Sequence, residues 1–108
     1  MVAVALVICH AGHGTTMAAL TRGVPLVCVP GHGRDQEPIA TRVSELGLGI
    51  ALPRAASARM IRDAARAILA DGGYRARARD FAQLAGQPDG AQRAADELLR
   101  LFDEPTQA

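Results

Sequence analysis

Three apolar runs stand out in the first half of this chain, and each is followed within a few residues by glycine or proline. Valine, leucine, isoleucine and alanine dominate them, as in strands that are buried on both faces of a parallel sheet. The runs predict strands at residues 2–9, 25–29 and 48–52. A segment long enough for a helix follows each run, so the pattern predicts an α/β fold with parallel strands.

Apolar residues recur at helical spacing between and after these runs. The first predicted helix covers residues 15–22, with Thr15 as its N-cap and Gly23 as its stop. The second covers residues 35–46, and Ser57 caps a third. Together with the strands, these helices predict a partial doubly wound, Rossmann-like parallel sheet of about three strands with flanking helices.

The last third of the chain predicts a helical C-terminal tail. Two amphipathic segments, residues 74–85 and 91–102, are separated by a turn rich in glycine. The cluster Arg75, Arg77 and Arg79 is interpreted as a solvated helix face and not as an anion site.

Length and charge restrict the classes of function. The chain has 108 residues, of which 49% are hydrophobic, and we expect one globular domain over residues 1–103 and a frayed tail over residues 104–108. The formal net charge is +1, and the basic residues are interleaved with acidic ones, which gives no support to nucleic-acid binding. The N-terminal run is too short to span a bilayer, so we expect a cytoplasmic protein without a membrane span.

Cysteine and histidine raise the question of a metal site. Such a site could be assembled from Cys9, His10, His13 and His32, but their spacing matches no zinc pattern, and Cys9 should face the core. His13 and His32 lie in glycine-rich segments and are expected to be exposed. Cys9 and Cys28 lie in apolar runs, where free cysteine behaves as a small hydrophobic residue. We therefore expect no metal and a reducing compartment.

The segment from His10 to Thr16, with the sequence HAGHGTT, leads from the first predicted strand into the first helix. Such a connection leaves unpaired backbone N–H groups at the positive end of the helix. Phosphate is the commonest biological anion bound there, so the segment predicts a nucleotide or sugar-phosphate site at the carboxyl end of the strand. His10 lies at the rim, where it could donate to phosphate or satisfy backbone groups of the turn.

Counting this segment, five short motifs follow one another in a defined order. They are His10–Thr16, Arg22-Gly23-Val24-Pro25, Pro30, Asp35-Gln36 and Leu46-Gly47-Leu48-Gly49. In this order the motifs resemble the donor-binding half of the family 1 glycosyltransferases, which have a two-domain B-type (GT-B) fold and include glucuronosyltransferases and macrolide sugar transferases. The resemblance is strong over residues 4–52 and weaker over the helical tail, and it implies that residues 1–103 form a partial nucleotide-sugar donor-binding domain.

The resemblance implies a binding role for the first motif. His10 would contact the diphosphate of a nucleotide diphosphate sugar, linked to UDP or TDP. Gly12 and Gly14 would let the backbone approach that diphosphate. Thr15 or Thr16 would donate to the phosphate nearer the sugar.

The resemblance also implies the rest of the reaction. Asp35 and Gln36 would bind hexose hydroxyls, and Asp35 is in addition a good helix N-cap. The hexose would be transferred with inversion to an acceptor hydroxyl. Neither cofactor nor metal is expected, because the helix end and the histidine offset the charge of the leaving diphosphate.

The chain departs from the family pattern at several points. Ala18 stands where many members have a glutamate that holds the ribose hydroxyls, and the segment from Pro30 to Asp35 is one residue longer than expected. The upstream half of the donor domain and the acceptor domain, with its usual histidine base, have no counterpart in the sequence. We therefore assign no catalytic residue and expect the chain alone to be inactive.

Several interpretations stay open. The chain could be a truncated part of an enzyme, a non-catalytic donor-binding subunit that acts with a separate acceptor-domain chain, or a vestigial protein without a ligand. Since one neighbour of the first strand would come from the absent half, we expect an exposed strand edge that pairs with a partner or with a second copy.

Overall fold

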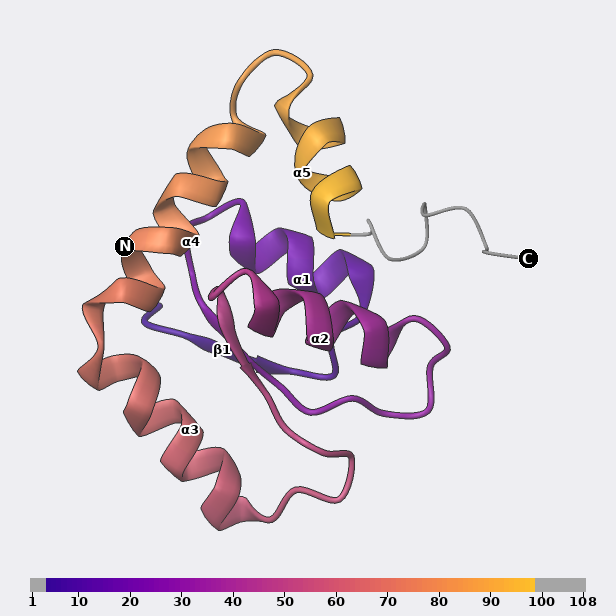
Figure 1. Ribbon diagram of the computed structural model, residues 1–108, viewed down its shortest axis with the longest axis vertical. Helices are drawn as coiled ribbons and strands as arrows, with labels where there is room; N and C mark the ends of the chain where they lie inside the picture. Colours follow the sequence, from indigo (N-terminus) through magenta and orange to yellow (C-terminus); the bar gives the residue numbers. More distant parts are fainter. Residues whose placement is uncertain (1–3, 99–108) are drawn as a thin grey trace.

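The computed structural model describes residues 4–98 and contains a three-stranded parallel sheet with helices on both faces (Figure 1). The strands are β1 (Val7–Cys9), β2 (Leu26–Cys28) and β3 (Gly49–Ala51), in the spatial order β1-β2-β3. Directly opposed residues include Cys9 and Cys28 in β1 and β2. The predicted α/β, Rossmann-like fold class is thereby confirmed.

The strands are shorter than predicted, most clearly at β1, where residues 4–6 lie outside the ladder. In the same register, residues 4–6 would pair with Gly23, Val24 and Pro25, which connect α1 to β2. Proline has no backbone N–H to donate to a ladder. Only the Pro25 carbonyl takes part, by accepting a bond from the Val7 N–H at 3.0 Å.

Five helices follow the predicted order. They are α1 (His13–Leu20), α2 (Gln36–Glu45), α3 (Ala58–Ala70), α4 (Gly72–Ala85) and α5 (Gly90–Leu98). Ser57 caps α3 as predicted, since its side chain accepts a hydrogen bond from the Met60 N–H. The predicted start of α4 at Tyr74 is wrong by two residues, because Asp71 caps the helix through the Gly73 N–H.

The start of the first helix also corrects the prediction. Its N-cap is Gly12 and not Thr15, and its first turn closes when the Thr16 N–H donates to the Gly12 carbonyl at 3.0 Å. The glycines at 12 and 14 are thus part of the helix start and not of a preceding loop.

The two faces of the sheet differ in the size of their core. Leu26 and Cys28 face the larger core, which α1 and α2 cover and to which α4 and α5 contribute. Val27 faces the opposite side, where it packs with Ala64 and Ile68 of α3. Figure 1 shows α3 apart from α1 and α2, across the sheet. The alternation along β2 follows from the two-residue period of a strand.

β1 lies at the edge of the described sheet. Its burial on both faces, predicted from the apolar run, is wrong: Ile8 is 53% exposed, and Val4 ahead of the strand is 46% exposed. An open apolar cavity of about 230 Å³ lies beside it, lined by residues that include Val7, Ala18 and Val24. The predicted exposed edge of the first strand is therefore present among the described residues.

The arginines of α4 are not simply a solvated face. Arg75 donates to the carbonyls of Val4 and Gly23, each at 3.3 Å, and Arg77 donates to the Gly47 carbonyl at 2.6 Å. These carbonyls precede β1, β2 and β3 respectively. Arg75 and Arg77 therefore hold α4 against the amino edge of the sheet, defined as the edge where the strands begin. Arg79 is exposed, as predicted for the cluster.

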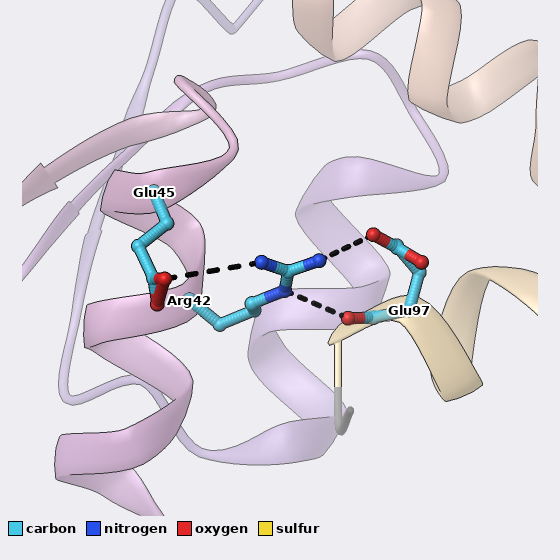
Figure 2. A network of polar contacts seen from close by, with 3 residues as sticks. All are labelled: Arg42, Glu45 and Glu97. Atoms are coloured by element: carbon cyan, nitrogen blue, oxygen red, sulfur yellow. Dashed lines mark hydrogen bonds and ion pairs between the residues drawn. The ribbon is translucent and has the colours of Figure 1, made fainter. Parts of the chain in front are cut away.

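An ion-pair network joins α5 to α2 (Figure 2). The Arg42 side chain is 12% exposed, donates from Nε to the Glu97 carbonyl at 3.0 Å, and pairs with the Glu97 carboxylate. Glu45 lies on its other side, at 3.9 Å. The part of the predicted 91–102 helix beyond residue 98, and the predicted frayed tail, lie outside the described residues.

Candidate functional site

The predicted ligand-binding residues come together at the carboxyl edge of the sheet, defined as the edge where the strands end. His10 follows β1 directly, and α1 begins three residues later. Asp35 and Gln36 stand at the start of α2, after the loop that leaves β2. A hydrogen bond of 2.9 Å between His10 Nδ1 and the Val29 carbonyl joins the first of these connections to the second.

The amino end of α1 is an open set of backbone donors. No side chain caps it, and in an α-helix the N–H groups ahead of the first closed turn, here those of His13, Gly14 and Thr15, have no partner within the helix. A Cβ atom built on Gly12 or Gly14 would meet no atom within 4 Å. Gly12 has an ordinary φ of −67°, so its missing side chain matters for space and not for conformation. We call these N–H groups the α1 cradle.

The turn between β1 and α1 depends on Ala11, which sequence reasoning missed. Ala11 has a φ of 68°, in the left-handed region that residues with a Cβ rarely adopt. It is fully buried in the larger core, and this packing holds the strained conformation in place. Such strain is often found beside binding sites. Nothing in the sequence indicated that an alanine would take the position usually given to glycine.

His10 has one ring nitrogen occupied and one available. Its Nδ1 lies against the Val29 carbonyl, which can only accept, so Nδ1 carries a proton. The ring is exposed, and its Nε2 could donate to an anion only when the imidazole is doubly protonated. The two roles predicted for His10 are thus compatible. Nδ1 satisfies a backbone carbonyl, and Nε2 is available to a ligand.

The two threonines after the cradle differ in what they present. Thr15 is exposed, whereas Thr16 is fully buried. The Thr16 N–H is used in the first turn of α1, and its hydroxyl has no hydrogen-bond partner among residues 4–98. Of the pair, Thr15 is the one whose N–H and hydroxyl can reach a ligand.

Two free cysteines lie beneath this junction. Cys9 is half-buried and Cys28 is fully buried. Donation from the Cys28 thiol, assisted by the Ala11 N–H and opposed by burial, lowers the pKa of Cys9 to about 6. The same contact, together with burial, raises the pKa of Cys28. Among residues 4–98, no group of three or more His, Cys, Asp or Glu side chains is arranged to hold a metal ion.

The acidic residue of the second connection, Asp35, occupies the predicted N-cap position of α2 but does not cap the helix with its side chain. Asp35 precedes α2 with φ of −92° and ψ of −6°, and its side chain makes no capping hydrogen bond. The predicted capping role of the carboxylate is therefore wrong. Its oxygens have no hydrogen-bond or ion-pair partner within the part of the chain that the structure describes.

Gln36 is partly occupied by its own loop. Its Oε1 accepts a hydrogen bond of 2.6 Å from the Gly31 N–H. A Cβ on Gly31 or on Gly33 would come within 2.8 Å or 2.6 Å of the Gln36 amide, so both glycines make room for it. Arg54, which sequence reasoning did not single out, donates from Nε to the Gly31 carbonyl at 3.2 Å.

Comparison with known proteins assigns this chain to a family. Residues 1–100 match the family described as erythromycin biosynthesis protein CIII-like, C-terminal domain. The chain is 37% identical over 94 residues to NDP-glycosyltransferase YjiC of Bacillus subtilis, which covers 86% of this chain and 24% of the relative. It is 42% identical, with the same coverage, to NDP-glycosyltransferase YjiC of Bacillus licheniformis.

A shorter match links the chain to a fungal enzyme. Over 45 residues, or 42% of the chain and 3% of the relative, the identity to a sterol 3-beta-glucosyltransferase of Aspergillus terreus is 51%. The chain spans about a quarter of the length of the two bacterial relatives. No helix among residues 4–98 is long and apolar enough to cross a membrane.

Proposed function

This chain belongs to the erythromycin biosynthesis protein CIII-like C-terminal domains of the family 1 glycosyltransferases, and from that premise we propose that it is the donor-binding portion of an inverting glycosyltransferase. The donor is a nucleotide diphosphate sugar linked to UDP or TDP, and the enzyme transfers its hexose to an acceptor hydroxyl. The reaction takes place in the cytoplasm.

The observation that most supports this proposal is the α1 cradle, which has no capping side chain. No atom lies within 4 Å of a Cβ built on Gly12 or Gly14, so a ligand has room there. The N–H groups of the cradle lie at the positive end of α1, where an anion is stabilised. His10, beside the cradle, adds a positive charge when its Nε2 is protonated. Charge develops on the diphosphate as the glycosidic bond breaks, and donors placed in advance stabilise it. In this proposal the reaction requires no metal or cofactor.

The donor hexose lies over the start of α2. The Asp35 carboxylate accepts hydrogen bonds from sugar hydroxyls, since its oxygens are not used for capping. Gln36 contributes only its amide NH₂, because its Oε1 is held by the Gly31 N–H. The exposed methyl of Ala18 cannot hold ribose hydroxyls, so affinity for the nucleoside half is weak.

Catalysis needs groups that the described chain does not provide. A general base must be positioned against the acceptor hydroxyl. Among residues 4–98, none of His10, His13 and His32 is paired with a carboxylate, and His10 is held by a backbone carbonyl. We therefore expect no sugar transfer by the 108-residue protein. Clear transfer from UDP-glucose or TDP-glucose would contradict this part of the proposal.

The alternative is a donor-binding subunit that acts with a separate acceptor-domain chain. The single-sided pairing of β1 and the apolar cavity of about 230 Å³ beside it favour this alternative, because exposed strand edges pair with other chains. The same edge supports self-association of the chain alone. Light scattering coupled to size-exclusion chromatography tests this, and a monodisperse, cooperatively melting monomer would argue against it. An acceptor domain encoded in frame upstream would instead indicate a truncated enzyme.

The proposal is tested by titrating the chain with UDP and TDP, followed by ¹⁵N NMR. Loose binding is expected, with shifts at Gly12 and Gly14. His10→Ala should weaken the affinity at least about fivefold, as for a charge-assisted hydrogen bond. His32→Ala, which removes an exposed histidine from the neighbouring loop, is the matched control and should change it less than about twofold. If neither diphosphate binds, or if both variants weaken binding equally, the proposal is wrong.

A further inference from the structure

The loop between β2 and α2, residues 29–35, is held by side chains from three segments that are distant in the chain or follow the loop. His10, after β1, binds the Val29 carbonyl, and Gln36, in α2, binds the Gly31 N–H. Arg54, after β3, binds the Gly31 carbonyl at 3.2 Å. The Gly31 residue is thus bonded at both its N–H and its carbonyl.

The backbone of Arg54 is itself well fixed. The Leu52 N–H continues the pairing of β3 by donating to the Cys28 carbonyl at 2.8 Å. A turn follows, closed by a hydrogen bond of 2.9 Å from the Ala56 N–H to the Pro53 carbonyl. Ser57 then caps α3. Arg54 therefore projects from a short turn that is anchored to the sheet on one side and to a helix on the other.

The start of the loop is fixed by the buried Pro30 and by the Val29 N–H, which donates to the Cys9 carbonyl. Beyond Gly31 it has few contacts, among them a bond of 3.3 Å from the Gln36 N–H to the Gly33 carbonyl. Gly31 and Gly33 carry no side chains, and both His32 and Arg34 are exposed. Ordering such a segment when a ligand binds costs conformational entropy, and contacts that order it in advance reduce that cost.

From these contacts we infer that Arg54 is a positioning residue for the sugar half of the donor. It holds the Gly31 carbonyl and thereby sets the path of the loop that delivers Asp35 and Gln36. This inference rests on the proposed function. Arg54 acts through the loop, whereas the α1 cradle lies on a separate connection, so loss of Arg54 should affect the sugar and not the diphosphate.

The test compares each nucleoside diphosphate with its sugar conjugate. The dissociation constants of UDP and UDP-glucose, and of TDP and TDP-glucose, are measured by NMR titration of the 108-residue chain. Arg54→Ala should leave the affinity for the diphosphates within about twofold and weaken that for the sugar conjugates about threefold to tenfold. Arg54→Lys keeps one donor and the charge, and it should restore part of the loss.

Two further measurements distinguish a positioning role of Arg54 from the loss of one positive charge and from a general disturbance of the fold. Arg62→Ala removes an exposed arginine whose ion pair is with its neighbour Asp63, and it should change neither affinity. In the ligand-free chain, Arg54→Ala should move the amide signals of Gly31 and Gly33 and leave those of Gly12 and Gly14 in place.

The outcomes distinguish this inference from the proposed function. If neither diphosphate binds the unaltered chain, the proposed function fails and the inference fails with it. If diphosphates bind but glucose adds no affinity, or if Arg54→Ala weakens both kinds of ligand equally, only the inference is wrong. An equal effect of Arg62→Ala would likewise overturn it.

Discussion

The two edges of the sheet use hydrogen-bonding groups in opposite ways. At the amino edge, arginines of α4 donate to carbonyls that follow α1 and α2, those of Gly23 and Gly47. At the carboxyl edge, the N–H groups at the start of α1 have no capping side chain, and the space above Gly12 and Gly14 is open. One edge is closed by side chains of the same chain, and at the other the start of α1 is open.

Helix polarity explains the difference. Because the strands are parallel, α1 and α2 end at the amino edge and begin at the carboxyl edge. Cations are favourable at helix ends and anions at helix starts. Arg75 and Arg77 supply cations at the ends of α1 and α2. Asp35 and Glu37 lie at the start of α2, whereas the first turn of α1 contains no acidic side chain. The comparison predicts that changes at one edge alter stability and that changes at the other alter binding.

The largest expected effect is loss of a single backbone donor from the α1 cradle. His13→Pro removes one N–H at the first position of the helix, where proline is well tolerated. Gly12 has a φ of −67° and a ψ of 149°, a conformation that can precede proline. UDP or TDP binding should weaken about tenfold, as when a hydrogen bond to a charged group is lost, while the melting temperature changes little.

His13→Ala is the matched control, since it removes the same side chain and keeps the N–H. It should bind the diphosphate as the unaltered chain does. Equal weakening in both variants would indicate that the imidazole, and not the backbone, contacts the ligand. Unchanged binding in both would separate the cradle from the diphosphate altogether.

A smaller effect is expected at the amino edge, on stability alone. Arg77→Ala removes the hydrogen bond to Gly47 and the contact of the guanidinium with the Tyr74 ring, 5.0 Å from its centre. Chemical denaturation should show a loss of about 1 kcal/mol in the free energy of unfolding, with diphosphate affinity unchanged. Arg66→Ala, on the exposed surface of α3, should cost less than about half of that. A loss of binding without loss of stability would reverse the assignment of the two edges.

The smallest effect concerns the thiols under the cradle. Because the pKa of Cys9 is lowered from 9.0 to about 6, its reactive thiolate forms as the pH rises through about 6 and is lost below it. Labelling of Cys9 by iodoacetamide, followed by mass spectrometry, should rise over that range. Cys28 should stay unlabelled at neutral pH, because its pKa is raised and it is buried. Cys28→Ala should move the midpoint for Cys9 upward, and an unmoved midpoint would contradict the thiol contact.

Local patterns in the sequence determined the order of strands and helices, the parallel sheet, and the edge at which His10 and Asp35 meet. Apolar runs and helical spacing depend only on which residues avoid water, and the Ser57 cap and the stop at Gly47, whose φ is 70°, are local as well. The family resemblance likewise rested on short motifs. All of these features can be read without knowing which distant segments touch.

Only the tertiary structure decided how the side chains at both edges are used. Arg75 and Arg77 looked solvated because the carbonyls they bind are at least 30 residues away in the chain. The left-handed Ala11 is held by core packing, Thr16 is turned inward, and Asp35 leaves its helix uncapped. Arg54 reaches Gly31 from 23 residues away. Each of these arrangements depends on contacts between elements that lie side by side only after folding, and no local pattern of apolar and polar residues carries that information.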